Sequence, residues 1–455
     1  MDFVSTRDRN HTTVTASKAI SNGLALDGGL YVPCAFPVLN GFIGTTYENI
    51  AFNILRLYLT DFGEEELKET IHLAYGDCLP VTLRGRYLEL FHGRTSAFKD
   101  VALQLFPYLL AASLRKQNIH QTAVILTATS GDTGSAVLAG VKNVPGMRAI
   151  VFYPADGVST IQKLQMTTQE GAHINVFGIK GNFDDAQRAV KEIFADEQFR
   201  SKYADRYVFT SANSINIGRL LPQIAYYFYA YAQLACNGTI KAGDWVNYVV
   251  PTGNFGNILA GYYAKKMGLP VNKLICATNV NDVLYEFIRT GVYNKKRQFK
   301  TTFSPSMDIL ISSNLERLIY DVGGYETVVK AYQSLERDGE FTMDDPLPLF
   351  DSEFVTDLET VHTIADEGGT CGHIIDPHTA VGRCAYDKYL KRTGDGTYTV
   401  ILATASPYKF PETVRQALGD VLHDPPQSLR SLEDRPVLHG EVIDDIRKTI
   451  EKILE

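Results

Sequence analysis

The chain has 455 residues, of which 45% are hydrophobic and 21% are charged, and its formal net charge is −8. This length allows two or more domains with a large core, and the composition excludes a disordered or fibrous protein. The negative net charge provides no long-range attraction to nucleic acid or to anionic membranes, so we expect neither as a partner.

The N-terminal twenty residues contain no apolar core followed by a cleavage pattern, so we expect no signal peptide. The longest apolar stretch, residues 224–236, is too short to span a bilayer. The six cysteines include no C-x-x-C pair, which is typical of reduced thiols. The sequence therefore predicts a cytoplasmic protein.

Short β-branched runs alternate with helical patterns along most of the chain. This alternation predicts an α/β fold with two parallel-type sheets flanked by helices. Four runs fall within residues 121–211, which we expect to form a small mobile domain. Residues 86–120 and 212–455 would form the large domain, with residues 1–85 as an N-terminal extension packed on it. The runs are 87–90, 122–129, 147–154, 173–179, 206–210, 245–252, 273–279 and 397–404.

Lys99 lies where a helix is expected to begin, in the segment FHGRTSAFKD of residues 91–100. Thr95 or Ser96 would supply an N-cap hydroxyl, and apolar periodicity starts at Val101. A cation at this position faces the positive end of the helix macrodipole, so we expect its pKa to be lowered. A readily deprotonated lysine attacks aldehydes, although a solvated lysine at a helix start is the simpler interpretation.

A second turn, TATSGDTGSAVLAG at residues 127–140, connects an apolar strand to a helix. Ser130, Gly131, Asp132 and Thr133 offer hydroxyls, backbone donors and one carboxylate, which suits a small polar substrate. The alternative is a plain helix start with Asp132 or Thr133 as the N-cap.

A third turn, PTGNFGN at residues 251–257, follows an apolar run and opens a helix. Gly253 and Gly256 permit close backbone approach, and the helix start presents N–H groups, so the turn is a candidate phosphate site. It matches neither the dinucleotide fingerprint nor the P-loop, and an ordinary strand-to-helix turn is the alternative.

A possible zinc site near the C-terminus is not supported by its spacing. The four candidate ligands, Cys371, His373, His378 and Cys384, match no common zinc pattern, so we expect no metal.

The hydroxyl of Thr404 is a candidate ligand contact. Thr404 follows a buried strand, at the sheet edge where α/β proteins bind ligands.

The last segment, EVIDDIRKTIEKILE, spaces isoleucines at helical intervals. We expect an amphipathic helix docked on the body of the protein.

Together these turns match the needs of pyridoxal phosphate. This cofactor requires a lysine that forms an imine, a cradle for its phosphate, a partner for its pyridine nitrogen and donors for the substrate carboxylate. Lys99, the turns at residues 127–140 and 251–257, and Thr404 supply one group of each kind.

The same segments resemble the threonine synthase family, whose members use pyridoxal phosphate and have the tryptophan-synthase-β-like fold. The resemblance runs in order from about residue 20 to about residue 415. It is seen in LELFHGRTSAFKDVALQLFPYL, TATSGDTGSA, QKLQMTTQEG, KGNFDDAQ, NSINIGRLLPQIAYYF, PTGNFGNILAG, PSMDILISSNLERL, DPHTAVG and ATASPYKFPE.

The resemblance implies specific roles for residues of this chain. Lys99 would carry the cofactor, and Thr404 would face the pyridine nitrogen as a neutral hydroxyl. The cofactor phosphate would be held by Gly253, Asn254, Phe255, Gly256 and Asn257, and the substrate by Ser130, Gly131, Asp132, Thr133, Asn213 and Arg219.

The implied reaction converts O-phospho-L-homoserine and water to L-threonine and phosphate, with a related lyase that releases 2-oxobutyrate as the alternative. Two residues depart from the family pattern. Arg94 adds a charge near Lys99, where it would bind a phosphorylated substrate or point to solvent. Ser406 replaces a family histidine, which puts any role of that histidine in doubt here.

Overall fold

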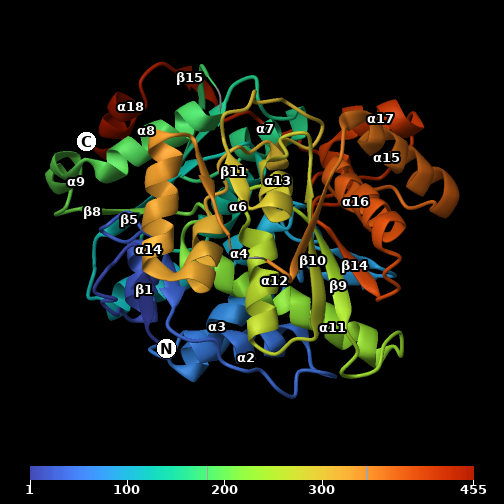
Figure 1. Ribbon diagram of the computed structural model, residues 1–455. Coiled ribbons are helices and arrows are strands. Elements are labelled where there is room, and N and C mark those ends of the chain that lie inside the picture. The colour runs from blue at the N-terminus through green and yellow to red at the C-terminus, as the bar shows by residue number, and fades with distance from the viewer. Residues whose placement is uncertain (182, 345–346) are drawn as a thin grey trace.

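The computed structural model describes residues 1–181, 183–344 and 347–455, and two sheets dominate it (Figure 1). The larger sheet has six strands in the order β13-β10-β9-β14-β4-β3, and every neighbouring pair is parallel except β3 with β4. Its strands are β3 Thr82–Arg84, β4 Tyr87–Glu89, β9 Val246–Pro251, β10 Val271–Thr278, β13 Phe350–Phe354 and β14 Thr399–Ala403.

The smaller sheet has five strands in the order β15-β7-β6-β5-β8, and all its pairs are parallel. In its register, Ile125 of β5 lies between Ala149 of β6 and Thr210 of β8. The predicted α/β fold with two parallel-type sheets is confirmed. The strands are β5 Thr122–Ala128, β6 Met147–Pro154, β7 Ile174–Ile179, β8 Tyr207–Ser211 and β15 Glu441–Ile443.

Alternate residues of the central strands pack on opposite faces, because strand side chains alternate in direction. Ile125 belongs to the cluster that includes α6, whereas Leu126 packs with α8. In the large sheet, Val250 packs with α12 and Val249 with α16. Both sheets are therefore covered by helices on both faces, which explains their continuous apolar runs. These helices are α6 Asp132–Val141, α8 Phe183–Ala195, α12 Gly256–Lys266 and α16 Pro377–Thr393.

Residues 1–85 form three helices, a two-stranded antiparallel pair of β1 with β2, and the edge strand β3. Helix α2 packs on α11, and α1 and α3 pack on α5, so this segment lies against the helices below the large sheet (Figure 1, blue). The elements are β1 Phe3–Ser5, α1 Ala16–Asn22, β2 Tyr31–Pro33, α2 Tyr47–Tyr58, α3 Glu64–Tyr75, α5 Phe106–Lys116 and α11 Ile224–Cys236.

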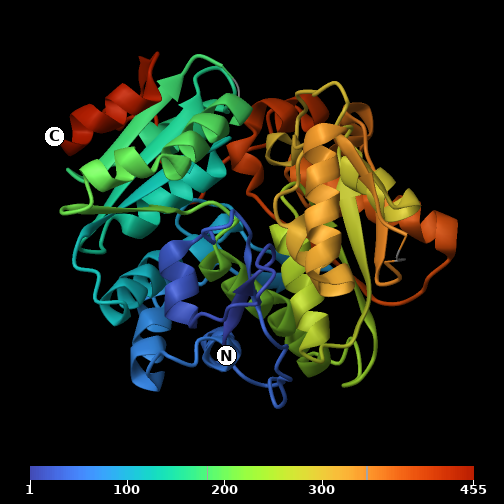
Figure 2. The same cartoon turned by 60° about the vertical axis from the view of Figure 1, so that its left-hand side comes forward.

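The C-terminal segment joins the small sheet. Strand β15 pairs with β7, and α18 (Ile446–Leu454) packs on α8, as Figure 2 shows. The predicted amphipathic helix is present, with Ile450 and Leu454 buried. The prediction placed residues 212–455 wholly in the large domain, but residues 441–455 join the small sheet and its helix α8. The physical reason is that β15 pairs with β7 and so covers an edge strand that would otherwise be open.

The remaining elements connect these layers, and α14 is interrupted at Gly324, whose φ of 72° is not helical. Strands β11 and β12 form a separate antiparallel pair. The bounds are α4 Lys99–Leu103, α7 Thr160–Thr167, α9 Glu197–Lys202, α10 Ile217–Leu220, η1 Leu221–Gln223, α13 Val283–Thr290, β11 Val292–Asn294, η2 Pro305–Met307, α14 Leu315–Arg337, β12 Glu340–Thr342, α15 Asp357–Cys371, η3 Pro407–Lys409 and α17 Pro411–Leu418.

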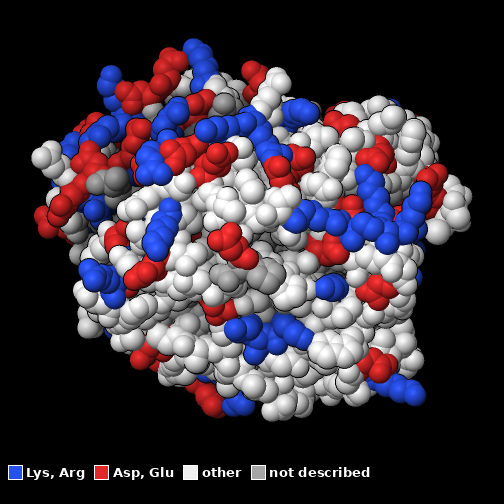
Figure 3. All heavy atoms as spheres, viewed as in Figure 1, with Lys and Arg blue, Asp and Glu red and all other residues white. Residues whose placement is uncertain are grey.

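The surface mixes both signs of charge. On the face seen in Figure 3, Lys and Arg are interspersed with Asp and Glu, most densely where Figure 1 places α8 and α18. None of the helices in the described residues has the length and apolar character needed to cross a membrane.

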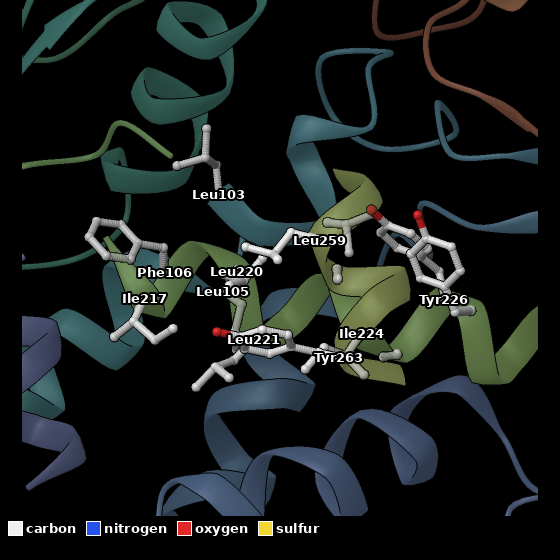
Figure 4. Close-up of a cluster of buried hydrophobic side chains, with 14 of the residues drawn as sticks. Leu103, Leu105, Phe106, Ile217, Leu220, Leu221, Ile224, Tyr226, Leu259 and Tyr263 are labelled. Atoms are coloured by element: carbon white, nitrogen blue, oxygen red, sulfur yellow. The ribbon is translucent and has the colours of Figure 1, made fainter. Parts of the chain in front are cut away.

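A buried core supports the helix that begins at Lys99. Leu103 of α4 and Phe106 of α5 pack with residues of α10 and α12, and all the labelled side chains are at most 1% exposed (Figure 4). Because interiors are close-packed, this core fixes α4 and α12 relative to one another. The labelled residues are Leu103, Leu105, Phe106, Ile217, Leu220, Leu221, Ile224, Tyr226, Leu259 and Tyr263.

Candidate active site

The loop before α4 places Lys99 beside the end of β14. Ala97 forms an antiparallel bridge with Ala405, and the Phe98 N–H donates to the Thr404 carbonyl oxygen at 2.8 Å. These backbone contacts join two segments that are about 300 residues apart in the chain, and they explain why Lys99 and Thr404 face the same cavity.

The helix begins at Lys99 as predicted, but the predicted N-cap is wrong. Phe98 is the N-cap residue of α4 and makes no side-chain capping bond. Thr95 instead donates from its N–H and its hydroxyl to the buried carboxylate of Asp100, at 2.8 and 2.7 Å. Asp100 therefore holds the loop in place of an N-cap hydroxyl. Its carboxylate accepts two hydrogen bonds from Thr95, whereas a capping hydroxyl would accept one.

A cavity of about 190 Å³ lies between the two sheets, at the carboxyl ends of their parallel strands. This is the edge where open α/β sheets bind ligands. Two of the predicted residues, Gly131 and Asp132, do not line it. The predicted residues that do line it are Lys99, Ser130, Thr133, Asn213, Arg219, Gly253, Asn254, Phe255, Gly256, Asn257 and Thr404.

The Lys99 amine is poised to lose its proton. Its Nζ lies 3.8 Å from Asp132 Oδ2 and 3.5 Å from the Ser306 hydroxyl. Burial lowers its pKa to about 8, although Asp132 acts to raise it; Arg219 and Lys409 act with burial. The direction agrees with the sequence prediction, but the largest cause is burial rather than the helix macrodipole.

Asp132 has partners of its own. Its Oδ1 accepts from Lys409 Nζ at 2.7 Å and from Gln162 Nε2 at 2.8 Å. The family resemblance implied that Asp132 helps to hold the substrate, but this ionised group would repel the carboxylate of an amino acid. Ser130 and Thr133 line the cavity from this turn, together with Ala128 and Thr129.

The glycine turn after β9 is arranged to receive an anion. Phe255 adopts a left-handed conformation with φ of 64°, and α12 starts at the next residue. The carbonyl oxygens of Gly253 and Asn254 accept hydrogen bonds from Ser312 and Asn314. The first N–H groups of a helix have no acceptor within it, so they are available to a phosphate in the cavity.

Asn257 contributes a donor to the same wall. Its Oδ1 accepts from the hydroxyls of Tyr226 at 2.6 Å and Tyr227 at 3.0 Å. Its buried Nδ2 has no hydrogen-bond partner. Because an unsatisfied buried donor is costly, this geometry favours an acceptor from a ligand.

Arg219 adds a buried cation to the lining of the cavity. It is 4% exposed, and its Nη1 donates to the Ala212 carbonyl oxygen at 2.7 Å, while its Nε has no partner. Burial lowers its pKa to about 10. The neighbouring Asn213 also has an unpartnered side-chain oxygen. A buried cation is stable only when it is paired, so an anionic ligand fits here.

Three family models match this chain: pyridoxal-phosphate-dependent enzymes over residues 88–405, the threonine synthase N terminus over 2–75, and the threonine synthase C-terminal part over 379–453. The threonine synthase of Saccharomyces cerevisiae is 38% identical, in an alignment that covers 92% of this chain and 89% of that protein. The chain belongs to the threonine synthase family. The threonine synthase of Pseudomonas aeruginosa is 39% identical, with 92% and 90% covered. The crystal structure of the pyridoxal-phosphate-bound threonine synthase from Brucella melitensis has a TM-score of 0.89 and 35% identity, and covers 100% of this chain and 98% of that one.

The cofactor of this threonine synthase family member is pyridoxal phosphate, and the cavity fits it. Lys99 supplies the amine, and the glycine turn with Asn257 Nδ2 supplies donors for a phosphate. Gly253 has no room for a side chain, because an added Cβ would lie 2.7 Å from the Ser306 carbonyl oxygen.

Sequence reasoning missed several polar residues of the cavity, and two of them, Ser306 and His378, contact one another. His378 Nδ1 contacts Asp376 Oδ2 at 2.7 Å, and its Nε2 accepts from the Ser306 N–H at 3.2 Å. Both lie in segments that resemble the family, PSMDIL and DPHTAVG, which was the available signal.

The two departures from the family pattern lie outside the cavity. Arg94 and Ser406 do not line it. Ser406 is buried, and its N–H donates to the Ser96 carbonyl oxygen at 3.1 Å. Neither residue is therefore placed to contact a ligand in the cavity.

The cysteine and histidine residues considered for zinc are separated by their contacts. His373 contacts Glu89, and His378 contacts Asp376. Within the ranges that the structure describes, no three His, Cys, Asp or Glu side chains form a group that could hold a metal ion.

Proposed function

We propose that this protein converts O-phospho-L-homoserine and water to L-threonine and phosphate. One observation supports this most strongly: Lys99, with a lowered pKa, lines a cavity together with Asn257 and Arg219, whose buried Nδ2 and Nε have no hydrogen-bond partner. A cofactor phosphate and a substrate phosphate each need such donors.

The cofactor would be held by Lys99 at its aldehyde and by the turn of Gly253, Asn254, Phe255, Gly256 and Asn257 at its phosphate. Thr404 would face the pyridine nitrogen. When bound, pyridoxal phosphate supplies an electron-withdrawing ring conjugated with the substrate nitrogen, which makes the Cα and Cβ protons easier to remove.

The substrate would be held by both sides of the cavity. Ser130 and Thr133 would donate to the amino-acid carboxylate, since both residues line the cavity at the start of α6. Gly131 does not line the cavity, and its N–H donates to the Thr129 hydroxyl at 2.9 Å, so it would shape this turn without touching the substrate. Arg219 and Asn213 would bind the substrate phosphate, with the buried guanidinium as the counter-charge.

Lys99 would move the protons of the reaction. Its uncharged Nζ would take the proton from Cα and then one from Cβ, as phosphate leaves Cγ. A proton returned to Cγ would then open Cβ to water, which would add there, and a proton returned to Cα would complete L-threonine. A long, flexible side chain allows one amine to reach successive carbons.

We propose that the small domain, residues 121–211, moves to close the cavity. Gln187 and Val190 of α8 line the cavity from this domain, opposite the glycine turn of the large one. Closure would exclude water until phosphate has left. We further propose that the protein works in the cytoplasm.

The test is product analysis with purified protein, pyridoxal phosphate and phosphohomoserine. Equal amounts of phosphate and threonine are expected, and Lys99→Ala should form neither. Lys388→Met is the matched control, because Lys388 pairs with Glu359 away from the cavity. Phosphate accompanied by 2-oxobutyrate instead of threonine would refute the proposal in favour of elimination.

A further inference from the structure

A second lysine is buried behind the cavity. Lys409, in η3, is 0% exposed, and its Nζ contacts Asp132 Oδ1 at 2.7 Å and the Thr95 carbonyl oxygen at 2.9 Å. It does not line the cavity, so it does not reach a ligand there. A lysine buried this completely is rare unless it is paired, and here the pair is the aspartate nearest to Lys99.

Asp132 thus lies between two amines from different parts of the chain. One oxygen is 2.7 Å from Lys409 Nζ, and the other is 3.8 Å from Lys99 Nζ. Burial acts to raise the pKa of Asp132, but Lys409 and Lys99 hold it well below its usual range, so the carboxylate is ionised. The shorter contact goes to the lysine that is not in the cavity.

We propose that Lys409 is a positioning residue for Lys99: by pairing closely with Asp132, it prevents this carboxylate from holding the Lys99 amine in its charged, unreactive form. The inference rests on the proposed role of Lys99 as the amine that carries the cofactor. The hydrogen bond from Lys409 to Thr95 also anchors the loop that leads to Lys99.

The charges around Lys99 agree with this assignment. Lys409 and Arg219 act to lower the pKa of Lys99, and Asp132 acts to raise it. His378 accepts a hydrogen bond from the Ser306 N–H, and burial raises the pKa of Asp100, which the charge of Lys409 also acts to lower. Removal of Lys409 would leave Asp132 with Lys99 as its main counter-charge and would therefore favour the ammonium form.

The experiment measures how fast cofactor-free protein attaches pyridoxal phosphate as the pH is raised, with the modified lysine identified by borohydride reduction and peptide mapping. Lys409→Met should move the midpoint of the rate profile up by about one pH unit. This is the low end of the pKa shift that an opposite charge, here Asp132 at 3.8 Å from Lys99 Nζ, produces. Asp132→Asn should move it down. The double variant should lie between the two single variants.

Matched variants separate positioning from folding. Lys388→Met removes a lysine that also pairs with an acid and a carbonyl oxygen, at 2.8 and 2.7 Å, and should leave the midpoint unchanged. Lys409→Arg should stay close to the unmodified protein. If Lys409→Met does not fold, Lys409→Gln takes its place, because glutamine removes the charge but keeps a donor for Asp132 and Thr95. Lys409→Gln should also move the midpoint up.

Opposite shifts for Lys409→Met and Asp132→Asn would establish the proposal. Equal midpoints for all variants, or shifts in the same direction, would overturn it. Because attachment at Lys99 is measured without substrate, these shifts are independent of whether threonine is formed, so failure of the proposed reaction is distinguished from failure of this inference.

Discussion

Replacement of Gly253 by alanine tests the glycine turn. An alanine Cβ would lie 2.7 Å from the Ser306 carbonyl oxygen and 3.3 Å from Met307 Cα, both of which are backbone atoms. Backbone cannot rotate away as a side chain can, so the 306–307 segment must move. Overpacking of this kind costs about 1–3 kcal/mol. Because the Ser306 hydroxyl is 3.5 Å from Lys99 Nζ, the same movement disturbs the cavity.

The expected result is a cofactor-free protein that is less stable by about 1–3 kcal/mol and binds pyridoxal phosphate about tenfold to a hundredfold more weakly. Urea unfolding and absorbance titration measure the two quantities. Gly256→Ala is the matched control, since its Cβ would meet Asn314 Nδ2 at an ordinary 3.5 Å. If Gly253→Ala and Gly256→Ala were equally stable and bound the cofactor equally well, the steric argument would be refuted.

Three further predictions concern charges. Burial acts to raise the pKa of Glu89, but hydrogen bonds from His373 and His92 lower it from 4.5 to about 2. The ionised carboxylate therefore stabilises the folded protein above about pH 4.5. This stabilisation is lost as the pH falls toward 2. Glu89→Gln should flatten the fall in unfolding free energy over this window, and an unchanged slope in urea titrations would contradict the assignment. Arg219→Met should raise the KM for phosphohomoserine at least about tenfold, as expected for loss of a charge-assisted hydrogen bond of about 1.5–3 kcal/mol; a KM equal to that of the unmodified protein would exclude Arg219 from the phosphate site. Arg94→Met should leave this KM within about twofold, because the side chain lies outside the cavity, and a tenfold rise would show that Arg94 reaches the substrate.

Local sequence patterns predicted where the elements begin and end. The strand before Gly253 and the helix after it follow from an apolar run and a glycine turn, and the start of α4 at Lys99 follows from apolar periodicity. These signals work because a strand that is buried on both faces and a helix with one buried face each leave an apolar pattern within a few consecutive residues. The resemblance to a family then gave the fold and the cofactor.

Long-range contacts could not be predicted in this way. The hydroxyl of Thr95 was available as a cap, but Asp100 takes it once the loop is folded. Asp132 carries a charge that suits a ligand, yet Lys409, nearly 280 residues later, pairs with it. Strand β15 is short and exposed, and only its pairing with β7 assigns it to the small sheet. Asp132 and β15 have partners that are distant in sequence, and no local rule names them. Asp100 is only five residues from Thr95, but its carboxylate takes the hydroxyl only in the folded loop.

The most direct measurement is the identity of the lysine that binds the cofactor. The protein is incubated with pyridoxal phosphate, reduced with borohydride and digested, and the modified peptide is identified by mass spectrometry. The account predicts one modified residue, Lys99, because its amine faces the cavity and has a pKa lowered to about 8. Modification at Lys409 or at a surface lysine, with Lys99 unmodified, would contradict it.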